Sequence, residues 1–208
     1  MSIKITYKNG INEKSIQNYV LFSNEEFNVY GLNKTLLGKH SSQLNRTIKS
    51  NKSKKKEVIS FNLNSDQKII LIKIKKNQTS TENEKKGANF YNFIKSNMLT
   101  NLTFFDGNFN ETQNKNKIFL DEFLHGLKIK SYEFNKYKTK KEKSDININI
   151  SFRKKIPKKI KNDRFSSLVE GTNFTKDLVS EPGNILHPDE YSKKKFQQKL
   201  KIIDLHLC

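Results

Sequence analysis

Residues 165–191 read FSSLVEGTNFTKDLVSEPGNILHPDEY, and this stretch decides how the chain is organised. Its first part carries apolar residues at roughly helical spacing, which predicts a helix. Pro182 disfavours helical geometry at the residue before it, so the helix should end near residue 181. Pro188 suits the first turn of a second helix, because the N–H group that proline lacks has no partner there. The stretch therefore predicts two helices separated by a proline-marked break.

The ends of these two helices carry capping residues. Asp163 can accept hydrogen bonds from the free N–H groups of the first turn. Gly183 or Asn184 is expected to adopt a left-handed conformation that turns the chain. Asp189 and Glu190 lie early in the second helix, where the positive end of the helix dipole favours negative charge.

The same stretch resembles the segment that joins the two domains of the leucyl aminopeptidase (cytosol aminopeptidase) family. In that family, a helix with an acidic-Gly-x-x-x-x-(Arg/Lys)-Asp-Leu-Val core precedes a Pro-x-Asn-x-Leu-x-Pro turn. The matching positions in this chain are Glu170, Gly171, Lys176, Asp177, Leu178, Val179, Pro182, Asn184, Leu186 and Pro188. Lys176 stands where arginine is usual, and His187 stands where a threonine that can cap the helix is usual.

A second segment carries the same resemblance. Residues 126–139, GLKIKSYEFNKYKT, look like the family's Gly-x-x-x-(Arg/Lys)-Ser-Tyr-x-Phe-(Asp/Asn)-x-Tyr-(Arg/Lys)-Thr segment, which ends the last helix of its N-terminal domain. The resemblance implies a macro-domain-like, three-layer α/β fold. Residues 71–76, LIKIKK, lack the Gly-Leu-Gly turn that often follows a central strand in the family. Because close approach to phosphate needs such glycines, a retained phosphate-cradling loop is not expected.

Hydrophobic periodicity independently predicts an α/β domain with a mixed sheet and helices on its faces. Strands are expected over residues 3–7, 18–22, 58–63, 69–74, 99–105 and 146–152, with turns at 64–67 and 106–107. Helices are expected over residues 32–48, 79–98 and 117–136, the second capped by Thr79, Ser80 or Thr81. Residues 51–56 and 136–143 are expected to be basic loops.

Together these patterns divide the chain into three parts. Residues 1–155 are assigned to a macro-like N-terminal domain, 156–187 to an interdomain linker helix and turn, and 188–208 to the truncated start of a catalytic domain. Exposed apolar surface is expected on the linker helix, where the catalytic domain would cover it.

This division predicts structural roles for several residues in the C-terminal part of the chain. Turn hydrogen bonds and interdomain packing are the roles expected for Asp177, Pro182, Asn184 and Pro188. We interpret Ile202, Ile203 and Leu205 as a remnant of the first strand of the catalytic domain.

The resemblance also implies a chemistry. The family removes N-terminal amino acids from peptides at a site with two divalent metal ions, manganese or zinc, which activate a water. It is cytoplasmic and forms homo-hexamers. Its Asp-Gly-Gly and Asn-Thr-Asp-x-Glu-Gly-Arg motifs do not occur in this sequence. The chain is therefore expected to serve assembly and positioning, to have the missing catalytic domain as its partner, and to be inactive alone, so whether to call it an enzyme stays open.

No substitute catalytic, cofactor or metal site is expected. The histidines lack ligand spacing: His40, His125, His187 and His206. His125 is interpreted as a packed or partly exposed residue beside an apolar helix face. Asp121 and Glu122 are neighbours that point apart on a helix, so solvated surface is favoured over an acid/base pair.

The formal net charge of +19 suggests an alternative, a stand-alone nucleic-acid-binding module. Its expected contacts are Lys138, Lys140, Lys141, Lys154, Lys155, Lys158 and Lys159, interleaved with Tyr132, Phe134 and Tyr137 that could stack on bases. A solvated loop with packed aromatics is the favoured interpretation, because lysines are spread along the whole chain. Cys208 is the single cysteine, which excludes a disulfide within the chain and suits a reducing compartment. No signal sequence or membrane-spanning run is predicted.

Overall fold

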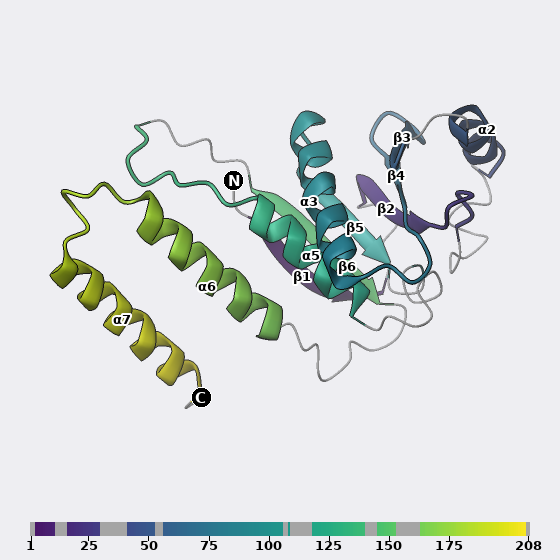
Figure 1. Cartoon of the computed structure of the whole chain (residues 1–208). Coiled ribbons are helices and arrows are strands. Elements are labelled where there is room, and N and C mark those ends of the chain that lie inside the picture. The colour runs from purple at the N-terminus through teal and green to yellow at the C-terminus, as the bar shows by residue number, and fades with distance from the viewer. Residues whose placement is uncertain are drawn as a thin grey trace.

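The computed structural model describes residues 3–10, 16–29, 41–52, 56–105, 108, 118–139, 145–152 and 163–206. Its strands are β1 (Ile3–Asn9), β2 (Asn18–Ser23), β3 (Val58–Asn62), β4 (Lys68–Lys73), β5 (Asn101–Phe105) and β6 (Ile146–Phe152). Its helices are α2 (Ser41–Lys52), α3 (Ser80–Ser96), α5 (Phe119–Lys130), α6 (Asp163–Ser180) and α7 (Pro188–His206) (Figure 1).

The strands form one mixed sheet in the order β1-β6-β5-β2-β4-β3. All neighbours are parallel except β3, which pairs antiparallel with β4. The predicted turn between these two strands is present, since the Leu63 N–H donates to the Gln67 carbonyl at 2.8 Å. The Asn64 side chain closes the turn by accepting from the backbone N–H groups of Asp66 and Gln67. The predicted strand pair is therefore confirmed.

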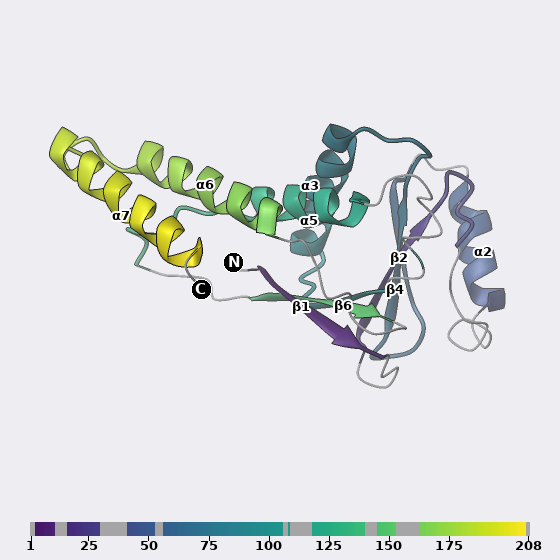
Figure 2. The ribbon, with the colours of Figure 1, turned by 90° about the horizontal axis from the view of Figure 1, so that it is seen from below.

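Helices cover both faces of the sheet (Figure 2). Helices α3 and α5 pack on one face over a phenylalanine-rich core, in which the Phe22 ring meets Phe119 and Phe123 edge-on at 5.0 and 5.3 Å. Helix α2 packs on the other face through the buried side chain of Leu44. The three-layer α/β fold predicted from the sequence is confirmed.

Two glycines let α3 and α5 cross at backbone contact. A Cβ atom on Gly87 would lie 1.8 Å from the Phe123 carbonyl oxygen, and one on Gly126 would lie 1.9 Å from the Glu84 carbonyl oxygen. Real Cβ atoms do not approach backbone that closely, so both positions exclude every side chain. Gly126 is the first residue of the segment that resembles the leucyl aminopeptidases. The close crossing of the two helices explains why this position requires glycine.

A buried carboxylate joins the N-terminal ends of the same two helices. Glu122 is only 2% exposed and accepts hydrogen bonds from Ser80 Oγ at 2.5 Å and Asn83 Nδ2 at 2.7 Å. The interpretation of Asp121 and Glu122 as solvated surface is therefore wrong for Glu122. Asp121 is half-buried, and burial, with a smaller contribution from the Glu122 charge, raises the pKa of its carboxyl group.

Some element bounds differ from those that the sequence predicted. Helix α2 continues through Lys52, so its last two residues lie where a basic loop was expected; neither of them is a Gly or Pro that would break the helix. Helix α5 ends at Lys130, earlier than expected, because the Ser131 N–H closes the last turn onto the carbonyls of Leu127 and Lys128. The predicted segment 32–40 and the turn at 106–107 lie outside the described residues.

Helix α3 begins and ends with recognisable caps. The Thr79 hydroxyl accepts from the Glu82 N–H at 3.3 Å, and the Glu82 carboxylate accepts from the Thr79 N–H at 2.8 Å. Thr79 is one of the three N-cap candidates that the sequence predicted, and the hydrogen bonds of this capping box lower the pKa of Glu82. At the other end, the N–H groups of Met98 and Leu99 donate to the carbonyls of Lys95 and Ile94, which is a Schellman motif.

Met98→Gly is expected to stabilise the protein by about 0.5 kcal/mol, because Met98 holds the left-handed position of the Schellman motif. Its φ is +50°, a region in which glycine alone has no Cβ penalty, and its side chain is 89% exposed, so little packing is lost. Urea unfolding measures the change. Met98→Ala is the control, because it removes the same exposed side chain but keeps the Cβ, and an equal gain in both variants would contradict the explanation.

Helices α6 and α7 lie beyond the sheet, with α6 running alongside α5 (Figures 1 and 2). The predicted pair of helices with a break after residue 180 is confirmed. The interpretation of Ile202, Ile203 and Leu205 as a strand remnant is wrong, because α7 continues to His206. A helix satisfies its own backbone groups, whereas a lone strand would leave them unpaired.

Candidate functional site at the hinge between α6 and α7

Three segments meet where α6 ends: the last turn of α6, residues 131–139 after α5 (here called the strap), and α7. Residues 181–187 connect α6 to α7 and are here called the hinge. The residues singled out by the sequence, Asp177, Pro182, Asn184 and Pro188, all lie in or beside this region.

The beginning of α6 packs against α5. The His125 ring lies 5.4 Å from the Phe165 ring, and Val169, one turn further along α6, is buried. His125 Nδ1 lies 2.9 Å from Glu84 Oε1, and the His125 side chain is 13% exposed. The interpretation of His125 as a packed residue beside an apolar face agrees with these contacts.

Lys176 connects α6 to the C-terminal end of α5. Its Nζ donates to the Ile129 carbonyl at 3.1 Å and lies 5.1 Å from the centre of the Tyr132 ring. The last carbonyls of a helix lack helical partners and carry the negative end of the dipole. Lys176 therefore supplies a cation where α5 requires one, at the position where the leucyl aminopeptidase family usually has arginine.

Asp177 connects α6 to the strap. The Tyr132 hydroxyl donates to Asp177 Oδ1 at 2.7 Å. Burial and this hydrogen bond raise the pKa of Tyr132 to about 12, so the phenol remains a donor throughout the neutral range. The contact gives Asp177 a structural position within this chain, whereas its interdomain role stays a prediction.

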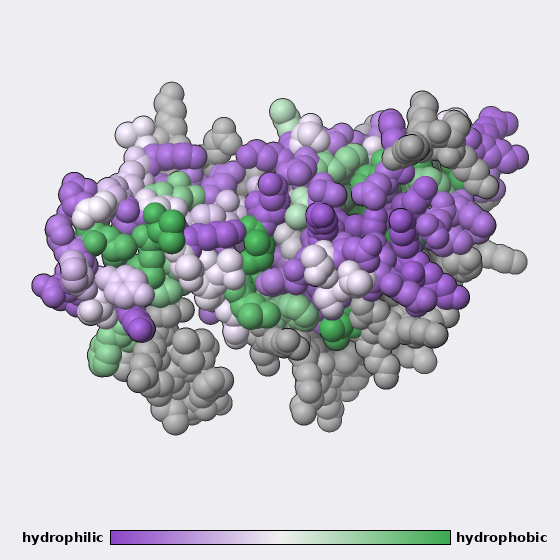
Figure 3. Space-filling view, viewed as in Figure 1, coloured by the Kyte–Doolittle hydropathy of each residue, from purple (hydrophilic) through white to green (hydrophobic). Residues whose placement is uncertain are grey.

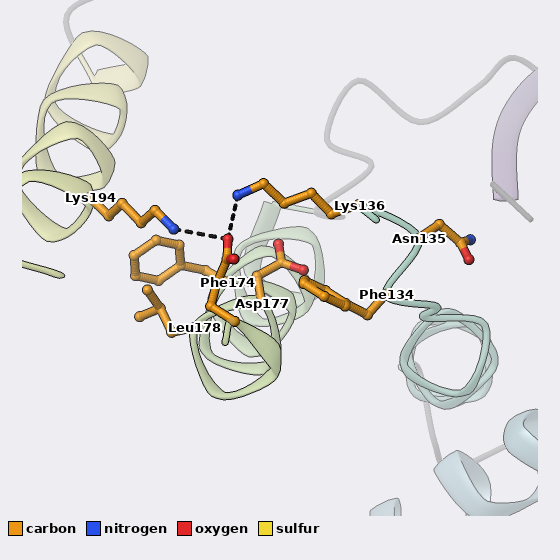
Figure 4. A pocket seen from close by; sticks show the side chains of 8 residues that line it. Phe134, Asn135, Lys136, Phe174, Asp177, Leu178 and Lys194 are labelled. Atoms are coloured by element: carbon orange, nitrogen blue, oxygen red, sulfur yellow. Dashed lines mark hydrogen bonds and ion pairs between the residues drawn. The ribbon is translucent and has the colours of Figure 1, made fainter. Parts of the chain in front are cut away.

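Glu181 is the common acceptor of the region. Its Oε1 accepts from Lys194 Nζ of α7 at 2.9 Å and from Lys136 Nζ of the strap, and its Oε2 accepts from the Tyr137 hydroxyl. Figure 4 shows Lys194 of α7 and Lys136 of the strap both reaching this carboxylate. The Glu181 side chain is 3% exposed. The hydrogen bonds from Lys136, Tyr137 and Lys194 lower the pKa of Glu181 to about 2.

A groove of about 390 Å³ lies beside this carboxylate. Its apolar wall is formed by Phe134, Phe174 and Leu178, and its polar residues are Asn135, Lys136, Asp177, Glu181 and Lys194 (Figure 4). The charged groups that line it already have partners, because Lys136 and Lys194 bind Glu181 and Asp177 binds Tyr132. The groove is therefore a junction between segments with an apolar wall.

The hinge itself is a hydrogen-bonded turn. The N–H groups of Ile185 and Leu186 both donate to the Pro182 carbonyl, at 2.9 and 3.1 Å. The expectation of a left-handed residue is wrong, since neither Gly183 nor Asn184 has a positive φ. The turn closes on the Pro182 carbonyl, which makes a left-handed residue unnecessary. Helix α7 begins at Pro188 as predicted, with the Tyr191 N–H donating to the His187 carbonyl.

Large apolar side chains on α6 and α7 face solvent. Leu168 and Val179 on α6 are 46% and 81% exposed, and Phe196 on α7 is 63% exposed. Figure 3 shows hydrophobic surface at the end of the molecule where these helices lie. The exposed apolar surface predicted for the linker helix is present.

The basic region proposed for nucleic-acid binding is described only in part. Lys138 is exposed, while Lys140, Lys141, Lys154, Lys155, Lys158 and Lys159 lie outside the described residues. The tyrosines that precede these lysines contact α6 and the hinge instead, because Tyr132 binds Asp177 and Tyr137 binds Glu181. Nucleic-acid binding stays a prediction.

Among the described residues, no group of three or more His, Cys, Asp or Glu side chains could hold a metal ion. They therefore do not fit the two divalent metals that the sequence resemblance implies. In the same part of the chain, the search for a helix long and apolar enough to cross a membrane found none.

A mixed six-stranded sheet in three layers, followed by two helices with a proline-marked hinge between them, defines the class as a three-layer α/β domain with a C-terminal helix pair. Solved structures share this fold. The chain superposes on tomato leucine aminopeptidase with a TM-score of 0.67 and 19% identity, covering 92% of this chain and 41% of the tomato chain. Cytosol aminopeptidase from Coxiella burnetii gives a TM-score of 0.59 and 10% identity, covering 90% of this chain and 36% of that one.

Curated proteins match part of the sequence. A probable cytosol aminopeptidase from Rhodopseudomonas palustris is 33% identical over 76 residues, which is 35% of this chain and 15% of that protein. One from Phytoplasma australiense is 35% identical over 77 residues, 36% of this chain and 16% of that protein. No protein-family model matches the chain. The chain thus resembles the N-terminal part of the leucyl aminopeptidase family in sequence and fold, and the resemblance predicted from its sequence is confirmed.

Proposed function

We propose that this chain is the N-terminal, non-catalytic part of a metal-dependent leucyl aminopeptidase, an enzyme that removes N-terminal amino acids from peptides. One observation carries the proposal. The superposition on tomato leucine aminopeptidase covers 92% of this chain but only 41% of the tomato chain. The matched part contains the sheet, whereas the described residues provide no group of metal ligands.

In this proposal the chain positions a catalytic domain. The two divalent metals, manganese or zinc, belong to that domain, where they activate the water that attacks the peptide. The residues of this chain bind neither metal nor peptide, and the hinge carries the connection through Pro182, Asn184 and Pro188. Residues 1–155, 156–187 and 188–208 serve as N-terminal domain, linker and start of the catalytic domain, in a cytoplasmic homo-hexamer.

The first test is an aminopeptidase assay. The purified 208-residue chain is incubated with leucine p-nitroanilide and Mn²⁺, and release of p-nitroaniline is followed. No turnover above buffer with Mn²⁺ is expected. Turnover that depends on this chain would overturn the proposal, because it would require a catalytic site within these residues.

The second test asks whether the chain can replace its counterpart. In a chimera, it takes the place of the matching N-terminal part of the Phytoplasma australiense protein, and the chimera is assayed beside that unmodified protein. An assembled, active chimera is expected. A chimera that folds, elutes at the size of the unmodified protein and yet has no activity would contradict a positioning role.

A further inference from the structure

In the part of helix α7 whose side chains are described, one contact joins the helix to the residues before it. In its described side chains, residues 188–197, Lys194 is the residue whose hydrogen bond reaches back across the hinge, and its partner is Glu181. The ion pair of Lys193 with Glu190 stays within α7. Between α6 and α7, Pro182, Gly183 and Asn184 are exposed, and Gly183 has no atom within 4 Å of where its Cβ would lie. Residues 182–184 of the hinge are therefore exposed.

The geometry points to Glu181 as a latch: we propose that its carboxylate fixes the direction of α7 by binding Lys194 and Lys136 together, and that α7 swings about the hinge once that charge is removed. Glu181 belongs to neither α7 nor the strap, because it follows α6 directly and precedes Pro182. It is thus placed to hold α7 on one side and the strap on the other. This inference does not depend on the proposed function.

The charge of Glu181 matters more than its hydrogen-bonding capacity. Two ammonium groups share one carboxylate oxygen, so the carboxylate separates two like charges. A neutral amide at this position would leave Lys136 and Lys194 facing each other without an intervening anion, and like charges at that separation repel. Glu181→Gln is therefore expected to push α7 away from the strap rather than merely loosen it.

The latch is expected to hold across ordinary solution conditions. The Glu181 side chain is 3% exposed and that of Lys194 is 27% exposed, and salt screens such partly buried pairs much less than exposed ones. Release therefore requires a substitution or a competing partner for the lysines.

The test measures the angle between the helices with two spin labels. Ser167→Cys on α6 and Ser192→Cys on α7 place the labels at exposed positions, in the full chain with Cys208→Ser to remove the native thiol. Pulsed electron double resonance gives the distance distribution. The parent chain is expected to give one narrow distribution, and Glu181→Gln and Lys194→Gln are expected to shift and broaden it.

Lys193→Gln is the matched control, because it removes a neighbouring lysine whose partner lies within α7. It should leave the distribution unchanged. Far-UV circular dichroism and amide exchange of the sheet verify that each variant is folded. The proposal is overturned if the folded Glu181→Gln or Lys194→Gln variant keeps the parent distribution, if Lys193→Gln broadens it equally, or if the parent distribution is already broad.

Discussion

Gly126→Ala is expected to destabilise the fold by about 3 kcal/mol or more, because the added methyl group collides with backbone. The new Cβ would lie 1.9 Å from the Glu84 carbonyl oxygen and 2.6 Å from the Glu84 Cα. A flexible side chain could move aside, but these atoms belong to the backbone of α3. Relief requires α3 and α5 to separate, which opens the aromatic core that both helices cover.

Equilibrium urea unfolding, followed by far-UV circular dichroism, measures this loss. Gly171→Ala is the matched control, since Gly171 lies within α6 and a Cβ there would have no atom within 4 Å. That substitution is expected to stabilise the chain by about 0.5 kcal/mol, because alanine favours the helix. Equal stability of the two variants would show that α3 and α5 do not cross at backbone contact.

The same crossing is a feature that the sequence alone does not predict. Gly126 is part of the family match, but a glycine within a helical pattern does not reveal which backbone approaches it. Gly87, on the facing helix, has the same role and carried no signal beyond being a glycine. A close approach is a property of two segments, and the sequence around either one describes only its own helix.

The strands were predictable because their pattern is local. In β6, Ile146, Ile148 and Ile150 alternate with polar residues, and these isoleucines are buried while Asn147 and Asn149 between them are only partly buried. Thr79 and Glu82 form a cap at a spacing of three residues, which is equally readable. The burial of Glu122 was not predictable, because its partners Ser80 and Asn83 lie about forty positions away.

The hinge shows the same contrast between features that a local sequence pattern predicts and features that depend on residues far apart in the chain. Pro182 and Pro188 gave the end of α6 and the start of α7 from the sequence alone. Glu181 was not singled out, although it is the acceptor for Lys136, Tyr137 and Lys194. Two of these donors lie more than forty residues away, so only the fold brings them together. No periodicity distinguishes Glu181 from a solvated glutamate at the end of a helix.

Asn108 is a buried residue that the sequence also failed to reveal, and Asn108→Leu is expected to destabilise the protein by about 2–5 kcal/mol. Its side chain acts as a substitute strand: Oδ1 accepts from the Phe22 N–H at 2.5 Å, and Nδ2 donates to the Phe22 carbonyl at 2.9 Å. Strand β5 pairs with β2 only as far as Val20, so Asn108 continues the pairing beyond it. Leucine would leave both backbone groups of Phe22 buried without these partners.

Two measurements separate this explanation from a general loss of packing. Urea unfolding gives the change in stability, and hydrogen exchange monitors the Phe22 amide, which should lose protection more than the Val20 amide. Asn92→Leu on the exposed side of α3 is the matched control and should change stability by less than about 0.5 kcal/mol. If Asn108→Leu keeps the parent stability and the Phe22 amide stays protected, that amide has another acceptor and β2 does not depend on Asn108. If stability falls while both amides remain equally protected, the loss arises from packing around residue 108, and the substitute-strand explanation is wrong.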